Sequence, residues 1–198
     1  MTMRRFIIIG HTATTSGDFS LNDLSGATGR LDVLLRCVNS ALFLSHEMRR
    51  DTEIRLVLLG PPNAPKTIAL NGAEMKHLNP DERSTAALLK AALNKPIFGS
   101  SVNAGAGISV SRATFKVILA NAAKDSKIIA LKEDGADMRA AGLAPPLTFV
   151  LSDNREFSDD ELQALKDAGA EFISLGPKSL LASHCIVLAH NELDRKES

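Results

Sequence analysis

Charged residues at positions 30, 32 and 36 have the types and spacing that chemistry on a polar substrate needs. They belong to the segment that begins Gly29-Arg30-Leu31-Asp32 and continues to Arg36. A positioned carboxylate can accept a proton from a substrate or hold the substrate by a hydrogen bond, and arginines can clamp phosphate. Because a free Asp has a pKa of about 4 and is a weak base, orientation is an alternative to proton removal. A helix N-terminal acid beside two solvated arginines would explain the same residues without any activity.

A second block, near the C-terminus, combines a glycine corner with a thiol. The sequence Glu171-Phe-Ile-Ser-Leu-Gly176-Pro-Lys-Ser-Leu-Leu-Ala-Ser183-His-Cys185 predicts a short apolar strand, a Gly-Pro turn and a loop of small residues. A glycine at the C-terminal end of a strand lets the backbone approach a ligand closely, and open α/β sheets bind ligands at that edge. The block therefore indicates a ligand site, with ordinary strand-end turns as the alternative. Cys185 by itself is typical of a small buried hydrophobic residue.

These two blocks carry a resemblance to a known family. The block around Gly176 resembles the final cofactor-binding motif of the SPOUT methyltransferases, which bind S-adenosylmethionine in a backbone trefoil knot. The block Gly29-Arg30-Leu-Asp32-Val-Leu-Leu-Arg36-Cys-Val-Asn39-Ser-Ala-Leu-Phe-Leu-Ser45-His46 resembles the archaeal tRNA pseudouridine-54 N1-methyltransferases. The resemblance covers nearly the whole chain. It implies an α/β fold: a single SPOUT methyltransferase domain over residues 1–198, with a mainly parallel sheet and a C-terminal trefoil knot.

The resemblance also implies the cofactor, the partners and the site residues. It implies an archaeal, cytoplasmic homodimer that uses S-adenosyl-L-methionine, acts on tRNA and needs no metal. Asp32 is the expected catalytic residue, and Arg30, Arg36 and Asn39 are expected to bind the RNA. The expected cofactor-binding residues are Leu151, Ser152, Asp153, Gly176, Leu180, Leu181, Ala182 and Cys185. The chain departs from the family pattern Leu-Gly-Asp-His-x-Gly-Phe at Leu151-Ser-Asp-Asn-Arg-Glu-Phe157, where Ser152 has less backbone freedom than glycine.

The implied reaction needs no covalent intermediate on a thiol. Pseudouridine is joined to its sugar through carbon, so its N1 is free and is already a nitrogen nucleophile. Methylation there requires only removal of the N1 proton and alignment of the base, for which Asp32 is the candidate. We therefore assign Cys185 to the wall of the cofactor pocket.

The charge distribution is compatible with an RNA partner although the net charge is zero. Residues 1–127 carry 16 Lys/Arg and 10 Asp/Glu, and residues 128–198 carry 7 and 13, so the two parts have charges of +6 and −6. A basic part can face phosphate, although chance clustering on a solvated surface would give the same count. Apolar runs are too short to span a membrane, and Cys37 and Cys185 lack metal spacing, which favours a reduced, cytoplasmic protein.

The elements that must position these residues alternate between strands and helices, which predicts a mainly parallel α/β sheet. Strands are expected at 5–10, 55–60, 66–70, 128–131, 147–151 and 171–175, and helices at 30–50, from 80, at 111–123, at 158–169 behind a capping box, and around 186–188. The apolar stripe over residues 31–48 is wide enough to indicate an interface. Residues 99–107 are expected to form a flexible loop near the RNA or the knot entrance, and His46 and His190 to be capping or surface residues.

Three other functions remain open at this stage. A related SPOUT enzyme could act on a ribosomal RNA pseudouridine, and the lack of a strongly basic composition mildly favours tRNA. A Rossmann-type nucleotide-binding domain would need a glycine-rich turn directly after the first strand, where this chain has Gly10-His-Thr-Ala-Thr. A non-catalytic RNA-binding module would fail to bind S-adenosylmethionine.

Overall fold

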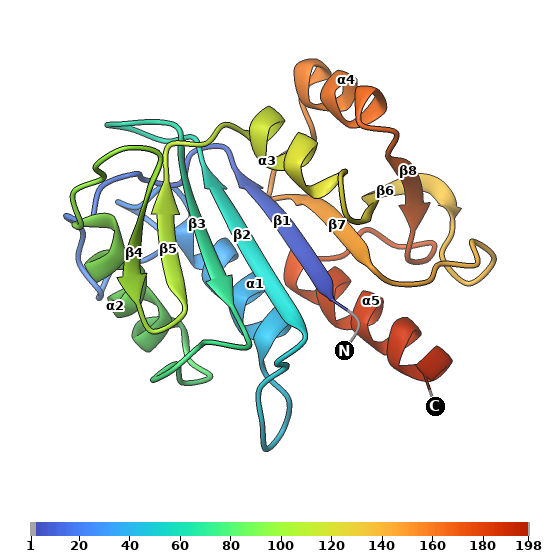
Figure 1. Cartoon of the computed structure of the whole chain (residues 1–198), viewed down its shortest axis with the longest axis horizontal. Helices are drawn as coiled ribbons and strands as arrows, with labels where there is room; N and C mark the ends of the chain where they lie inside the picture. Colours follow the sequence, from blue (N-terminus) through green and yellow to red (C-terminus); the bar gives the residue numbers. More distant parts are fainter. Residues whose placement is uncertain (1–2, 198) are drawn as a thin grey trace.

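The computed structural model describes residues 3–197 and has one eight-stranded sheet with helices on both faces (Figure 1). The strands are β1 Arg4–Gly10, β2 Thr52–Leu58, β3 Lys66–Asn71, β4 Ser101–Gly105, β5 Ile108–Ser111, β6 Lys127–Asp137, β7 Leu147–Ser152 and β8 Glu171–Ser174. The helices are α1 Leu31–Leu42, α2 Glu82–Leu93, α3 Phe115–Ala122, α4 Asp159–Asp167 and α5 Ala182–Glu197. No helix within residues 3–197 is long and apolar enough to cross a membrane.

The sheet is parallel in one half and antiparallel in the other. Its strand order is β4-β5-β3-β2-β1-β7-β6-β8. Strand β1 pairs in parallel with β2 and β7, and β6 pairs in parallel with β7 and β8. Strands β3, β4 and β5 are added in antiparallel orientation. The carboxyl ends of β1, β2, β6, β7 and β8 therefore lie at one edge, where ligands of open α/β sheets bind.

Strand β1 is buried on both faces and separates two apolar layers. Phe6 and Ile8 face the layer that α1, α2 and α5 cover, whereas Ile7 and Ile9 face the layer of α3 and α4. All four side chains are completely buried. This is the continuous apolar pattern expected of a central parallel strand, because its side chains alternate between two covered faces.

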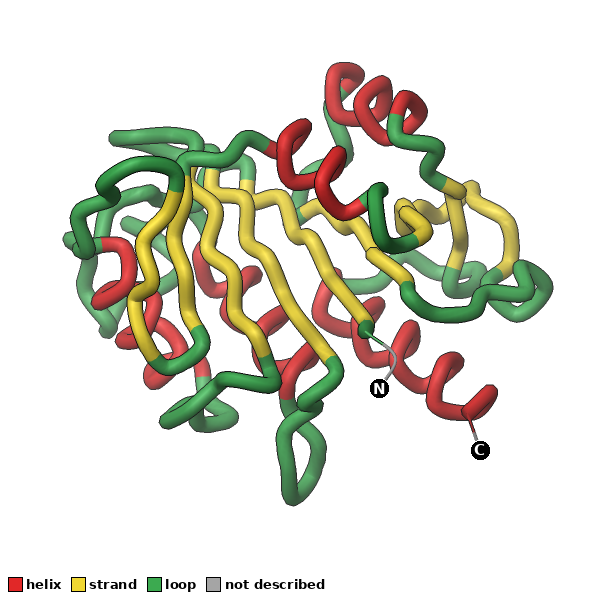
Figure 2. The backbone as a smooth tube through the Cα atoms, in the orientation of Figure 1, coloured by secondary structure: helices red, strands yellow, loops and turns green. Residues whose placement is uncertain are grey.

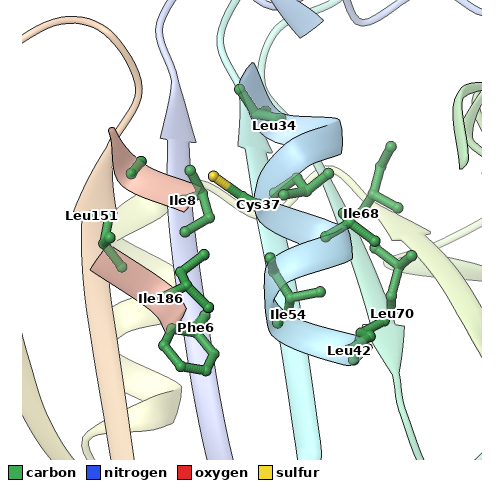
Figure 3. Close-up of a cluster of buried hydrophobic side chains, with 14 of the residues drawn as sticks. Phe6, Ile8, Leu34, Cys37, Leu42, Ile54, Ile68, Leu70, Leu151 and Ile186 are labelled. Carbon is green, nitrogen blue, oxygen red and sulfur yellow. The ribbon is translucent and has the colours of Figure 1, made fainter. Parts of the chain in front are cut away.

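The first helix is shorter than the sequence predicted, and its apolar stripe has another explanation. Helix α1 ends at Leu42, and Phe43 continues as extended chain that forms a β-bridge with Met48, so residues 43–50 are not helical. Leu34, Leu35 and the rest of the stripe within the helix are completely buried in this chain. Figure 3 shows Leu34, Cys37 and Leu42 of α1 beside Ile54, Ile68 and Leu70 of the sheet. The stripe packs on the sheet, α2 and α5 and gives no support to an interface between chains.

The predicted loop and helix between residues 99 and 123 also need correction. Residues 101–111 form the hairpin β4–β5, with a bulge between Asn103 and Gly105, so this segment is the edge of the sheet. Ser111 ends β5, and the cap of α3 is Thr114, whose side chain accepts a hydrogen bond from the Val117 amide. The capping box at Ser158 and Glu161 is confirmed. The apolar run at 186–188 is helical, as predicted, and lies within α5.

Helix α5 is fixed to the start of β1 by a buried polar cluster. His190 is only 2% exposed, so its expected surface position is wrong. Its Nε2 lies 3.1 Å from the Ala41 carbonyl oxygen and its ring packs on Phe6. Burial, with Arg49 and Arg4 nearby, lowers the pKa of His190 to about 3, so the ring is neutral. Burial of a neutral, hydrogen-bonded imidazole in this way ties the C-terminal helix to the core.

Strand β6 curves over the end of β8 (Figure 2). Both Leu131 and Ala136 are aligned with Ile173, so the intervening residues pass beside that strand. A Cβ atom added to Gly135 would lie 2.5 Å from the Ile173 nitrogen. Only glycine therefore permits this close crossing of the two backbones.

Candidate functional site

Three segments that are distant in sequence converge at the carboxyl edge of the sheet. The ends of β6, β7 and β8 and the start of α5 line one pocket. Seven of the residues predicted to bind the cofactor line it: Leu151, Ser152, Asp153, Gly176, Leu180, Ala182 and Cys185. Leu181 is 59% exposed and lies outside the lining. The convergence results from parallel pairing, because each of the three strands ends at the same edge.

The pocket offers backbone and neutral groups as well as charged side chains. The backbone at Gly176 has φ 141°, and a Cβ atom placed there would meet nothing within 4 Å. The Ser152 hydroxyl is buried and has no hydrogen-bond partner among the described residues. A buried hydroxyl without a partner is costly unless a ligand supplies one. Burial raises the pKa of Cys185 to about 11, so its thiol stays protonated and serves as a wall.

The Asp32 carboxylate is held by two arginines at the N-terminus of α1. Its oxygens lie 3.0 Å from Arg30 Nε and 2.9 Å from a terminal nitrogen of Arg36, while its side chain is 8% exposed. Burial opposes ionisation, but the hydrogen bonds from Arg30 and Arg36 outweigh it and lower the pKa of Asp32. A carboxylate with a lowered pKa is ionised and weakly basic. It is therefore better suited to orienting a polar group than to removing a proton.

Left-handed backbone conformations at two successive residues set the position of Arg30. Both Gly29 and Arg30 have positive φ, 64° and 66°. A Cβ atom at position 29 would lie 1.7 Å from the Thr12 carbonyl oxygen, so only glycine fits there. Asp32 first and, more weakly, Asp153 raise the pKa of Arg30. Arg30, at the start of α1, is therefore close enough to Asp153, which lines the pocket at the end of β7, for the two charges to attract each other.

A histidine that the sequence did not single out joins two carboxylates beside this pocket. His11 follows β1, and its Nδ1 and Nε2 lie 3.0 Å from Asp153 and 3.1 Å from Glu161. Burial opposes a charge on the ring, but the bonds to Asp153 and Glu161 outweigh it and raise the pKa of His11. The one feature of the sequence that could have identified His11 is its position directly after a central strand. Its partners, 142 and 150 positions away, could not be inferred from spacing.

Asn39 is not part of this arrangement. It lies seven residues after Asp32, about 10 Å farther along the helix, and its side-chain oxygen accepts a hydrogen bond from Thr85 of α2. Arg36 contacts Glu82 of α2 as well as Asp32. Of the predicted RNA-binding residues, Arg30 and Arg36 therefore surround Asp32, whereas Asn39 joins two helices. No cluster of His, Cys, Asp and Glu suited to a metal ion occurs within residues 3–197.

Comparison with known proteins connects this geometry to a family. A family model described as "Putative SAM-dependent RNA methyltransferase" matches residues 3–198. The chain belongs to this family. Similar proteins named tRNA (pseudouridine(54)-N(1))-methyltransferase include one from Methanosarcina acetivorans, which is 46% identical over 198 residues, covering 99% of this chain and 93% of the relative. Another, from Haloarcula marismortui, is 46% identical over 197 residues, covering 97% and 96%.

The fold of this family member also occurs in a solved structure. The crystal structure of Archaeoglobus fulgidus Nep1 bound to S-adenosylhomocysteine aligns with a TM-score of 0.69 over 100% of this chain and 99% of that chain. The sequence identity is 13%, so the likeness concerns the fold alone.

Proposed function

We propose that this chain is an S-adenosyl-L-methionine-dependent methyltransferase that methylates N1 of pseudouridine 54 in the T-loop of tRNA. The observation that carries this proposal is the end-to-end similarity, at 46% identity, to relatives that bear the name of this activity. The placement of the Arg30–Asp32–Arg36 group near a pocket at the carboxyl edge supports it, since both blocks that resemble the family contribute to one region. The whole chain would act as one catalytic domain.

The residues of the pocket fit the cofactor. Gly176 leaves room for a flat ring to approach the backbone, and Leu151 and Leu180 supply apolar walls. The Ser152 hydroxyl, which has no partner among the described residues, would gain one from the bound molecule. When bound there, S-adenosylmethionine supplies an electrophilic methyl group. The chain itself supplies the position of the cofactor.

The Asp32 group would hold the target base. Its ionised carboxylate can accept a hydrogen bond from N1–H of pseudouridine and align the ring, while Arg30 and Arg36 keep the carboxylate in place and face the RNA phosphates. The N1 proton then leaves to Asp32 or to water. Arg30 is 45% exposed, so a phosphate can reach it without disturbing the core.

The SPOUT-type trefoil knot and the homodimer are parts of the same proposal. Two observations support a knot: the close passage of β6 beside β8, which Gly135 permits, and the packing of α5, which follows β8, against α1. Leu180, Leu181 and Val187 are 40%, 59% and 51% exposed around the start of α5 and offer an apolar surface for a second copy. Both cysteines are free, in keeping with a reducing cytoplasm.

Nucleoside mass spectrometry tests the proposed activity. T-loop stems with pseudouridine or uridine at the target position are incubated with the protein and cofactor. Only the pseudouridine stem should gain a methyl group, because uridine has no free N1. Methylation of the uridine stem would refute N1 chemistry, and methylation of a ribosomal RNA stem in place of the tRNA stem would change the assigned substrate.

A further inference from the structure

The chain between β7 and α4 forms one wall of the cofactor pocket. Residues 151–153 and 155–157 line this pocket, and α4 begins at Asp159. We call residues 153–158 the β7–α4 segment. This segment belongs to no helix or strand, so its path depends on contacts with other parts of the chain. The shape of the pocket therefore depends on what holds the segment in place.

His11 contacts both the start of this segment and the helix that follows it. At the start, one oxygen of the Asp153 carboxylate accepts a hydrogen bond from the His11 backbone N–H at 2.8 Å, and the other lies 3.0 Å from Nδ1 of the ring. In the first turn of α4, Glu161 Oε2 lies 3.1 Å from Nε2 and also accepts a hydrogen bond from the Ser158 amide. One ring thus spans both ends of the segment.

Only a protonated ring can make both contacts as hydrogen bonds. A neutral imidazole has one N–H and one lone pair, whereas an imidazolium donates from both nitrogens. In the neutral ring, a lone pair would therefore face a carboxylate oxygen at 3.0 or 3.1 Å. The Asp153 and Glu161 side chains are 1% and 11% exposed, so water has little access to relieve that repulsion. Burial opposes the charge, but the bonds to the two carboxylates outweigh it and raise the pKa of His11.

The charge of the ring is set chiefly by these two carboxylates. Asp153 and Glu161 are the charged groups that contact it. Further charged groups stand on each neighbouring element and include both signs: Arg30 at the start of α1, Arg155 and Glu156 in the β7–α4 segment, Lys116 of α3 and Asp160 of α4. Because these groups are of mixed sign and farther away, they change the balance less than the two direct partners do.

We infer, on the basis of the function proposed above, that His11 is a positioning residue for the cofactor site, because its imidazolium holds both ends of the β7–α4 segment in the conformation that binds the cofactor. When the ring loses its proton, one of its two contacts is lost and the segment is no longer held at both ends. Cofactor affinity is therefore coupled to protonation of His11 and falls as the pH rises through the pKa of this ring. By reciprocity, the bound cofactor raises that pKa.

Calorimetric titrations over a range of pH test this coupling. The probe is S-adenosylhomocysteine, which lacks the sulfonium charge, so the charge of His11 affects its binding chiefly through the position of the segment. The Kd values of wild type and His11→Gln are compared between about pH 6, near the usual pKa of histidine, and about pH 10.

The ratio of the two Kd values should change with pH. At the acidic end, His11→Gln should bind about 5- to 150-fold more weakly than wild type, which is the usual size of coupling between two sites. At the basic end, the two values should converge, because neither ring nor amide then carries a charge. A role of His11 confined to folding would give a ratio that is independent of pH. The matched control is His46→Gln, at an exposed histidine, which should behave as wild type.

A second variant tests the coupling without removing the ring. Glu161→Gln keeps an acceptor for the Ser158 amide, as the capping box requires, but removes one of the two charges that raise the pKa of His11. The pH at which the affinity for S-adenosylhomocysteine falls should therefore shift downward. Asp160→Asn is its matched control, because Asp160 is an exposed acid in the same turn of α4, and it should leave that pH nearly unchanged.

An NMR titration of the His11 ring measures the same coupling from the other side. S-adenosylhomocysteine should raise the pKa of the ring by one unit for each factor of ten by which protonation strengthens its binding. If the Kd ratio is constant with pH and the ligand leaves the pKa of His11 unchanged, the positioning role is refuted alone, since the protein still binds the ligand. If wild type binds no S-adenosylhomocysteine at any pH, the proposed function is refuted with it.

Discussion

Replacement of Asp32 by Asn separates orientation of the base from removal of its proton. The substitution keeps the size and one acceptor oxygen but removes the charge that Arg30 and Arg36 hold at 3.0 and 2.9 Å. Because these hydrogen bonds lower the pKa of Asp32, we expect a role in orientation. The loss is then one charge-assisted hydrogen bond to the base, worth about 1.5–3 kcal/mol. At about 1.4 kcal/mol per factor of ten, the rate should fall roughly ten- to 150-fold.

The assay is the single-turnover rate of methyl transfer at saturating tRNA and cofactor. Glu82→Gln is the matched control, because Glu82 also contacts Arg36 but does not touch Asp32. It should leave the rate unchanged, whereas Arg36→Ala should chiefly weaken tRNA binding. A wild-type rate for Asp32→Asn would reduce this residue to a helix N-terminal acid. A loss well beyond about 10³ would instead indicate that Asp32 removes the proton, since general bases contribute about 10²–10⁴.

Three further predictions concern the site and its surroundings. Gly176→Val should abolish S-adenosylmethionine binding measured by calorimetry, because φ 141° disfavours valine and its methyl groups would project into the open space at this position; tight binding would exclude Gly176 from the site. His11→Gln should lower the free energy of unfolding most below about pH 6.5, the usual pKa of histidine. The raised pKa of His11 means that its stabilisation is present at acidic pH and is lost as the pH rises through the folded-state value. Urea titrations at pH 5.5 and 9 measure the difference, and equal losses at both pH values would contradict it. Val187→Asp should shift the protein from dimer to monomer in sedimentation experiments if its exposed face of α5 is the dimer surface; an unchanged mass would rule that surface out.

The local sequence determined the central strands and several helix boundaries. The apolar run at 6–9 could only be a strand with two covered faces, and the structure buries all of it. Ser158 and Glu161 predicted the start of α4 because a capping box depends on residues three positions apart. The stripe of α1 was also visible, but its extent past Leu42 was wrong. Periodicity does not reveal where a chain leaves the helix to form a tertiary bridge such as that between Phe43 and Met48.

The residues of the candidate site were determined partly by local sequence motifs and partly by tertiary packing. The two motif blocks identified Asp32, Arg30 and part of the pocket lining, since those residues stand in recognisable local patterns. The sequence could not show that Asn39 turns to Thr85 or that Leu181 lies outside the lining, because the direction of a side chain depends on the packing of neighbouring elements. It also could not show that His11 joins Asp153 to Glu161.

The sequence by itself therefore determined the type of each central strand and the residues available for chemistry. Only the tertiary structure decided which of them meet. Parallel pairing of β1 with β7 brings residues more than 140 positions apart to one edge of the sheet. The register of β3 and β5 likewise places Thr67 opposite Ser111. Such neighbours arise from hydrogen bonding between distant strands, a long-range interaction that leaves no periodic signal along the chain.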